Sequence, residues 1–181
     1  LIAKKSGSWF FLGELLVDAE IEPDQPMADF CGSCTRCIEA CPTQAIVEPY
    51  LLDGRRCISY LNIELREDIP VQLRPLLGNL VFGCDICQDV CPWNKEPAVS
   101  SYAGFGSASR VVDLKKLARL TPDEFSEVFR RRPVKRTKWR GLLRNVAVAM
   151  GNSGDDGVIP ELMLLRQCGD EMVERHAAWA L

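Results

Sequence analysis

Eight of the nine cysteines lie in two closely spaced groups, and cysteine thiolates are ligands for soft metal centres. The first group has the spacing Cys-x2-Cys-x2-Cys-x3-Cys-Pro and comprises Cys31, Cys34, Cys37 and Cys41. The second group has an isolated cysteine followed by Cys-x2-Cys-x3-Cys-Pro, and it comprises Cys57, Cys84, Cys87 and Cys91. Gaps this short turn several sulfurs toward one centre, which predicts metal chemistry.

The first spacing is the ligand pattern of bacterial two-cluster ferredoxins, in which three cysteines hold one [4Fe–4S] cluster and the fourth holds the neighbouring cluster. The second group matches this pattern with its first ligand displaced to Cys57. Exchange of the fourth ligands predicts one cluster held by Cys31, Cys34, Cys37 and Cys91. It predicts a second cluster held by Cys41, Cys57, Cys84 and Cys87. The sequence therefore predicts two cubane clusters and electron transfer.

Zinc and disulfides are the competing interpretations of these cysteines. Zinc sites use separate four-ligand sets, often with histidine, and this chain has one His. Disulfides require an oxidising compartment, and no signal peptide precedes the cysteines. The ninth cysteine, Cys168, lies in an apolar run with Leu164 and Leu165, which predicts a buried structural thiol.

Length and composition predict an ordinary globular protein. The chain has 181 residues, of which 47% are hydrophobic, so we expect one or two small domains. No apolar stretch reaches the length of a transmembrane helix, and reduced cysteines indicate the cytoplasm. The chain starts at Leu1 and ends within an apolar helical pattern, so we interpret it as part of a longer protein.

Positive charge is concentrated in one segment. Residues 110–145 carry 12 basic and 4 acidic residues, although the chain has a net charge of −3. The basic block comprises Arg130, Arg131, Arg132, Lys135, Arg136, Lys138, Arg140 and Arg144. Such a block predicts phosphate contacts to a nucleic acid, with Trp139 stacking on a base. The alternative is a solvated charged face, with Trp139 packed in the core.

The remaining pattern predicts mostly helices. We expect a buried strand over Ser8–Gly13, short helices over residues 56–65 and 71–82, and a connector over residues 96–110. Helices are expected over residues 113–120, 121–131, 139–150, 158–167 and 171–181. The Thr121-Pro122-Asp123-Glu124 segment is typical of a helix start. Antiparallel helices of this length are consistent with a HEAT-like repeat.

Five segments together resemble the epoxyqueuosine reductase family, which is cobalamin-dependent and modifies tRNA. They are residues 7–14, 31–43, 55–61, 82–94 and 143–152. The resemblance implies an α+β fold: residues 1–22 as the end of a cobalamin-binding domain, 23–97 as a double [4Fe–4S] ferredoxin-like domain, and 98–181 as the start of a helical HEAT-like domain. The family reduces epoxyqueuosine to queuosine at the tRNA wobble position, with electrons passing through the clusters to cobalamin.

The resemblance also implies partners and further site residues. Leu12, Leu15, Ser59, Cys84 and Asp85 match the cobalamin-facing edge, whereas ordinary core packing and surface roles are the alternatives for these side chains. The implied partners are a tRNA anticodon stem-loop and a low-potential ferredoxin or flavodoxin, with no membrane. No residue matches the catalytic acid of the family, so we expect this chain alone to be inactive.

Two other functions remain open at this point. One is a ferredoxin-type electron-transfer module of another cobalamin-dependent reductase. The other is a structural adaptor whose cysteines bind zinc. Salt-dependent tRNA binding distinguishes the first alternative from the tRNA-modifying enzyme. Stoichiometric zinc in place of iron and sulfide identifies the second.

Overall fold

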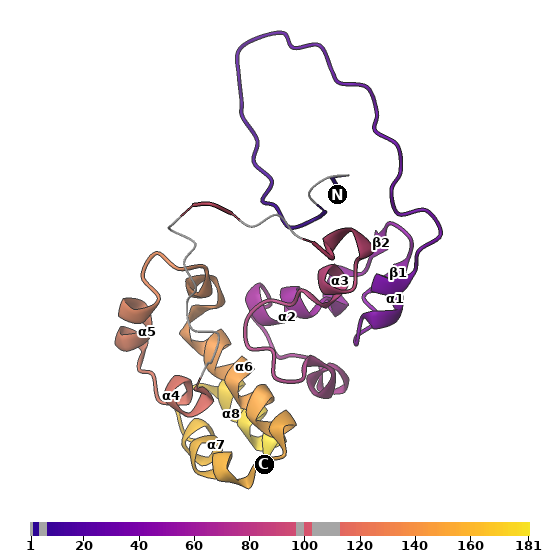
Figure 1. Ribbon diagram of the computed structural model, residues 1–181. Coiled ribbons are helices and arrows are strands. Elements are labelled where there is room, and N and C mark those ends of the chain that lie inside the picture. Colours follow the sequence, from indigo (N-terminus) through magenta and orange to yellow (C-terminus); the bar gives the residue numbers. More distant parts are fainter. Residues whose placement is uncertain (1, 4–6, 97–99, 103–112) are drawn as a thin grey trace.

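Short helices dominate the computed structural model, which describes residues 2–3, 7–96, 100–102 and 113–181 (Figure 1). The cysteine-rich half contains α1 (Arg36–Ala40), β1 (Ile46–Glu48), β2 (Leu51–Leu52), η1 (Gly54–Arg56), α2 (Ile58–Ile63), η2 (Val71–Leu77), α3 (Ile86–Asp89) and η3 (Pro92–Asn94), where η denotes a 3-10 helix. The other half contains α4 (Leu114–Ala118), α5 (Pro122–Val128), η5 (Pro133–Thr137), α6 (Lys138–Ser153), η6 (Asp156–Val158), α7 (Ile159–Leu165) and α8 (Glu171–Ala180). The two strands pair antiparallel, so the predicted α+β character is confined to the cysteine-rich half of the described chain.

Proline ends both helices that follow the cysteine loops. Cys41 and Cys91 each precede a proline, and both have extended backbone, with ψ of 112° and 125°. A residue before proline is disfavoured in the helical region, which explains why α1 and α3 stop after one turn. The two short helices lie against each other. Trp93 strengthens this pairing because its indole N–H donates to the Phe30 carbonyl at 2.9 Å.

Helix α6 is the centre of the other half. Every residue from Gly141 to Met150 is buried, and α4, α7 and α8 pack around it. The predicted helix start at Thr121 is present as a reciprocal capping box with Glu124. Gly154, with φ of +63°, ends α6 in a left-handed conformation that glycine adopts without strain. Among the described helices, none has both the length and the apolar character needed to span a membrane.

A second core joins the two halves. Ile58 and Leu61 from α2, together with Ile69 and Leu77, pack against Val148 of α6. All five side chains are almost fully buried. Helix α6 is therefore apolar on two faces, one toward α8 and one toward α2, as expected for a helix enclosed by neighbours.

Two predicted elements differ from those observed. Ser8–Gly13 is not a strand, and Phe11 and Leu12 are 96% and 72% exposed. The Ser8 N–H instead bonds the Asn94 side chain at 2.7 Å, and no neighbouring strand among the described residues supplies a ladder for it. Residues 71–82 form only the 3-10 helix η2, because Pro75 lacks the N–H that an α-helix requires. Most of the predicted connector, residues 96–110, lies outside the described residues.

The single histidine ties a loop of the cysteine-rich half to α8. His176 is fully buried; its Nε2 accepts the Ile69 N–H at 3.1 Å, and its Nδ1 lies 2.7 Å from the Met172 carbonyl. These partners require a neutral ring that carries its proton on Nδ1. Burial, together with the charges of Arg74 and Arg144, lowers the pKa of His176 to about 4, although Asp68 opposes the shift.

We expect acid to destabilise the fold through His176. The unfolded chain binds a proton at His176 below about pH 6.5, whereas the folded chain resists protonation until about pH 4. Stability from this residue is therefore complete above pH 6.5 and is lost as the pH falls toward 4, by up to roughly 3 kcal/mol. Chemical denaturation at pH 7.5 and pH 5 measures this loss. A His176→Gln variant should show a smaller difference between the two pH values, and an equal difference would contradict the assignment.

Candidate metal centre and basic surface

The fold brings Cys91 to the first three cysteines. Cys31 and Cys34 lie in the loop before α1 and Cys37 lies in α1, whereas Cys91 follows α3. These four side chains line one cavity of about 420 Å³, and Cys87 also reaches its wall. The Phe30–Trp93 ring pair, with centroids 5.5 Å apart, closes one connection between the two cysteine loops. Three thiols of the first group and two of the second, Cys87 and Cys91, therefore share a cavity.

The remaining cysteines form a second group. Burial raises the pKa of the Cys84 thiol, and the neighbouring charges of Cys57 and Cys41 raise it further. Burial likewise raises the pKa of Cys87, with added repulsion from Cys84 and Cys57. The charges of Cys57 and Cys41 thus act on Cys84, and those of Cys84 and Cys57 act on Cys87. The raised pKa values keep these two thiols protonated at neutral pH, and metal binding would release their protons.

Local hydrogen bonds act on Cys41 in the opposite direction. The Ala45 N–H donates to its sulfur at 3.3 Å, and the Thr43 hydroxyl lies 3.5 Å from it. Although burial opposes the effect, these bonds lower the pKa of Cys41. An N–H group directed at a cysteine sulfur stabilises the thiolate, which is the form that binds metal. These contacts therefore favour the metal-binding thiolate form of Cys41 even when no metal is bound.

Single-ion sites and cluster sites place their ligand sulfurs at different separations. A single zinc holds thiolates about 2.3 Å from the metal, so its ligand sulfurs lie close together. Among the described residues, no three His, Cys, Asp or Glu side chains converge closely enough to hold one metal ion. A cubane spans a larger volume and tolerates wider separation of its thiolates. All nine cysteines are free of disulfides, and Cys168 lies apart, half-buried against the helical core.

The residues predicted to face cobalamin lie on three elements. Ser59 lies in the first turn of α2, two residues after Cys57, and Asp85 is the N-cap residue of α3 directly after Cys84. Asp85 accepts a bond from the Gln88 amide at 3.3 Å. Leu12 lines the cavity of the first cysteine group, and Leu15 is 91% exposed on the extended segment that loops away from the helices (Figure 1). The structure thus places Ser59 and Asp85 beside the second cysteine group and leaves Leu15 remote from it.

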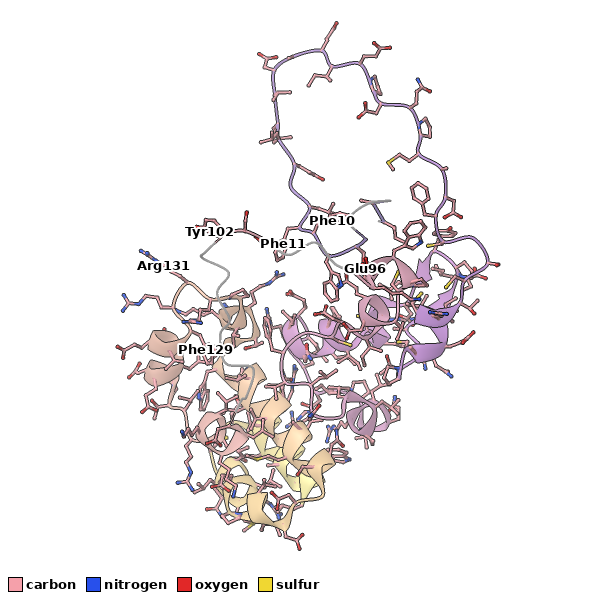
Figure 2. The ribbon with its side chains drawn as sticks, in the orientation of Figure 1. Phe10, Phe11, Glu96, Tyr102, Phe129 and Arg131 are labelled. Carbon is pink, nitrogen blue, oxygen red and sulfur yellow. The ribbon has the colours of Figure 1, made fainter. Side chains whose placement is uncertain are left out.

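Seven basic residues form an exposed surface at one end of the helical half. We call them the basic surface: Arg130, Arg131, Arg132, Lys135, Arg136, Lys138 and Arg140. They follow α5, occupy η5 and begin α6. Arg131 points away from the helices (Figure 2). Arg136 pairs with Glu64, and Arg140 pairs with Asp170 at 3.3 Å, so these two carry internal partners as well.

The prediction that Arg144 contacts phosphate is wrong. Its side chain is 1% exposed, and its guanidinium donates to the Leu61, Leu65 and Glu67 carbonyls at 2.7 to 3.0 Å. Arg144 lies four positions after exposed Arg140 on α6, but at this turn α2 and the segment that follows α2 cover the helix. Trp139 packs against the helical core, and its N–H donates to the Leu120 carbonyl at 2.6 Å, which confirms the core alternative.

Two buried asparagines beside the second cysteine group were missed from sequence. Asn62 is 0% exposed and Asn145 is 1% exposed. The available signal was a polar residue within an otherwise apolar helical stretch: Asn62 follows Leu61, and Asn145 precedes Val146. A buried amide needs partners for each donor and acceptor, so such a position indicates a specific network rather than general packing.

Comparison with known proteins agrees with this geometry. Residues 30–94, which contain all eight clustered cysteines, match the family model described as a 4Fe-4S double cluster binding domain. Over its whole length the chain is 42% identical to the epoxyqueuosine reductase of Escherichia coli (strain K12). It covers 48% of that protein, so the chain spans about half the length of the curated relatives it matches.

The chain is also similar to solved structures of epoxyqueuosine reductases. The epoxyqueuosine reductase from Streptococcus thermophilus superposes on the whole chain with a TM-score of 0.82 and 30% identity, and the chain covers 48% of it. An epoxyqueuosine reductase with a tRNA-Tyr epoxyqueuosine-modified tRNA stem loop matches 88% of the chain, with a TM-score of 0.78 and 35% identity, and the chain covers 43% of it. Both the cysteine-rich half and the helical half are therefore shared with these proteins.

Replacing Cys91, the ligand that the second cysteine group is predicted to contribute to the first cluster, should abolish that cluster. After anaerobic reconstitution we expect about eight irons per chain, and Cys91→Ala should retain roughly half of them. Cys91 lines the cavity of the first group only, so the EPR signal of the second cluster should persist. Cys168→Ala is the matched control and should leave the iron content unchanged. Full iron content in Cys91→Ala, or equal losses in both variants, would contradict the ligand assignment.

Proposed function

Because this chain is homologous over its full length to epoxyqueuosine reductases, we propose that it is the electron-transferring and RNA-binding part of such an oxidoreductase. The complete enzyme reduces epoxyqueuosine to queuosine at the tRNA wobble position. The observation that carries the proposal is the combination of two cysteine groups with a basic surface on η5 and α6, the elements that pack against α2. An electron-transfer module serving another reductase has no need of that surface.

The proposed ligands follow the crossed pattern. Cys31, Cys34, Cys37 and Cys91 hold one [4Fe–4S] cluster. Cys41, Cys57, Cys84 and Cys87 hold the other. Cys87 supports the close approach of the two clusters, because it belongs to the second set and also reaches the cavity of the first. Close approach of this kind allows electrons to pass from one cluster to the next without solvent exposure.

The proposed domain organisation has three parts. Residues 1–22 belong to a cobalamin-binding domain, residues 23–97 form the double-cluster domain, and residues 98–181 begin a HEAT-like helical domain. Paired antiparallel helices such as α7 and α8 support the last assignment. The exposed apolar side chains between Phe11 and Val17 support the first, because such a stretch is normally covered by neighbouring structure.

Bound cobalamin would supply a low-valent cobalt that removes the epoxide oxygen. We propose that Ser59 and Asp85 line its edge, since Ser59 lies two residues after Cys57 and Asp85 directly follows Cys84, both proposed ligands of the second cluster. With cobalamin bound at this edge, the second cluster would receive electrons from the first cluster and deliver them to the cofactor. Cys84 would serve both the cluster and the lining, and Leu12 and Leu15 would belong to the apolar wall. The electron donor is a low-potential ferredoxin or flavodoxin, and the compartment is the cytoplasm.

The basic surface is the proposed site for the tRNA anticodon stem-loop. Its seven exposed cations provide the sequence-independent attraction that a phosphate backbone requires. The solved relative with a tRNA stem loop supports this assignment. Arg144 has no part in it, because its side chain is buried.

Replacing cations of the basic surface should weaken RNA binding. For the double variant Arg132→Glu/Lys135→Glu we expect at least a tenfold loss of affinity for a tRNA stem-loop at 100 mM salt, measured by fluorescence anisotropy. The slope of log affinity against log salt should fall by about 2, since two phosphate contacts are lost. The control Lys115→Glu/Arg166→Glu removes the same charge elsewhere on exposed positions and should bind normally. Equal losses in both double variants would indicate only a change in net charge.

The activity is tested on the complete protein that contains this chain. It is reconstituted anaerobically with iron, sulfide and cobalamin, supplied with a low-potential reductant, and incubated with tRNA bearing epoxyqueuosine. Mass spectrometry of the digested tRNA should show loss of one oxygen from the modified base. Loaded clusters without any queuosine would overturn the proposed reaction and favour a different cobalamin-dependent reductase.

A further inference from the structure

Helix α2 connects the displaced cysteine to a buried amide. Cys57 immediately precedes α2, and its carbonyl accepts the Leu61 N–H at 2.9 Å in the first turn. Asn62, one residue further along, is completely buried on this six-residue helix. The position of Asn62 is therefore fixed relative to Cys57 by regular helical geometry.

Asn62 in turn holds the peptide that precedes Cys84. Its Oδ1 accepts the Gly83 N–H at 2.9 Å, and its Nδ2 donates to the Gly83 carbonyl at 3.0 Å. Two opposed bonds fix both the distance and the orientation of one residue, as a ladder pair does between strands. Gly83 has φ of +74°, a conformation that glycine adopts without strain. The loop around Gly83 has no regular secondary structure, so Asn62 supplies its local order.

Helix α6 supports the same pair from the other side. The Asn145 amide donates to the Asn62 carbonyl at 2.6 Å and to the Val81 carbonyl at 2.9 Å. Arg144 orients Asn145 by donating to its Oδ1 at 3.0 to 3.2 Å, and it also bonds the Leu61 carbonyl. The chain of contacts therefore runs from α6 through Asn145 to Asn62 and on to Gly83.

We propose that Asn62 is a positioning residue for the second cluster, and that the Arg144–Asn145 pair of α6 holds it in place. This inference rests on the proposed ligands Cys57 and Cys84. These are the two ligands of the second cluster that Asn62 connects, one through α2 and the other through Gly83. The proposed ligands of the first cluster depend on other contacts, since Trp93 joins their two loops by donating to the Phe30 carbonyl and Asn94 holds the loop of Cys91. A disturbance at Asn62 should therefore reach one cluster and spare the other.

The expected effect is on cluster properties rather than on folding alone. The orientation of backbone N–H groups and the access of solvent tune the potential of a cluster. If Gly83 loses its fixed orientation, the Cys84 sulfur and the following backbone amides change position together. The second cluster should then shift its midpoint potential or lose iron at the Cys84 corner, while the first cluster keeps its spectrum.

The test compares two asparagines that bridge the same parts of the chain. Asn62→Ala removes the bonds to Gly83. Asn152→Ala removes similar bonds from α6, since the Asn152 amide donates to the Arg74 and Gly78 carbonyls at 2.8 and 2.9 Å. EPR-monitored redox titration of each reconstituted protein resolves the two clusters, with Cys84→Ala and Cys91→Ala as references for their signals. We expect a changed or missing second-cluster signal in Asn62→Ala and wild-type signals in Asn152→Ala.

A milder pair of variants covers the case in which Asn62→Ala fails to fold. Gly83→Ala and Gly154→Ala both place a side chain at positive φ, and neither new Cβ has a heavy atom within 4 Å. The backbone strain is therefore comparable, but only Gly83 adjoins a proposed ligand. The same selective change is expected for Gly83→Ala and none for Gly154→Ala.

Different results would contradict the positioning role of Asn62 and the proposed function. Unchanged signals in Asn62→Ala, or equal changes in both clusters, would overturn the positioning role. So would an equal effect in the Asn152→Ala control. A wild-type protein that binds no iron and sulfide would instead overturn the proposed function, because the ligands themselves would then be wrong.

Discussion

The rest of the structure depends on the hydrogen bonds that the buried guanidinium of Arg144 donates. Its acceptors among the described residues are three backbone carbonyls near the end of α2 and the amide oxygen of Asn145. Burial lowers the pKa of Arg144 to about 10, so the side chain stays charged at neutral pH. Carbonyl dipoles at the end of a helix stabilise a cation, and this compensates the cost of removing it from water. Removing the guanidinium would leave these buried oxygens without a donor, which typically costs about 1–3 kcal/mol for each group.

This contact makes one unit of parts that are distant in sequence. Leu61 and Arg144 are 83 positions apart, yet the Arg144 guanidinium donates to the Leu61 carbonyl at 2.7 Å. His176 and Ile69 form a second tie between the same halves, and Arg175 pairs with Asp68 beside it at 2.8 Å. Separation of the helical half from the cysteine-rich half would leave a charge, a histidine and several carbonyls unpaired. The two halves are therefore expected to move together.

A rigid connection of this kind suits the proposed function. Helix α6 carries Lys138 and Arg140 of the basic surface in its first turn, and it carries Arg144 and Asn145 one turn later. The same helix thus presents exposed cations to solvent and supports the loop that precedes Cys84. An RNA held on the basic surface would have a fixed position relative to the second cluster. Fixed geometry between a substrate and its electron source is a common requirement of redox catalysis.

The sequence by itself determined the features that depend on short-range spacing. These are the two cysteine groups, the proline that ends each cysteine loop, the capping box at Thr121 and the glycine that ends α6. Each is encoded within a few residues, because ligand spacing and backbone preference act locally. The spacing also predicted the crossed grouping of ligands, since it repeats a ferredoxin pattern.

Tertiary structure alone decided which polar residues are buried and which apolar residues are exposed. Arg144 belongs to a basic run in the sequence, but its helical position turns it toward carbonyls roughly 80 residues away. Ser8–Gly13 has the composition of a buried strand, yet a strand forms only where another strand offers its hydrogen bonds. Asn62 and Asn145 acquire their roles in the same way. Burial is a property of the surroundings, and the surroundings come from distant parts of the chain.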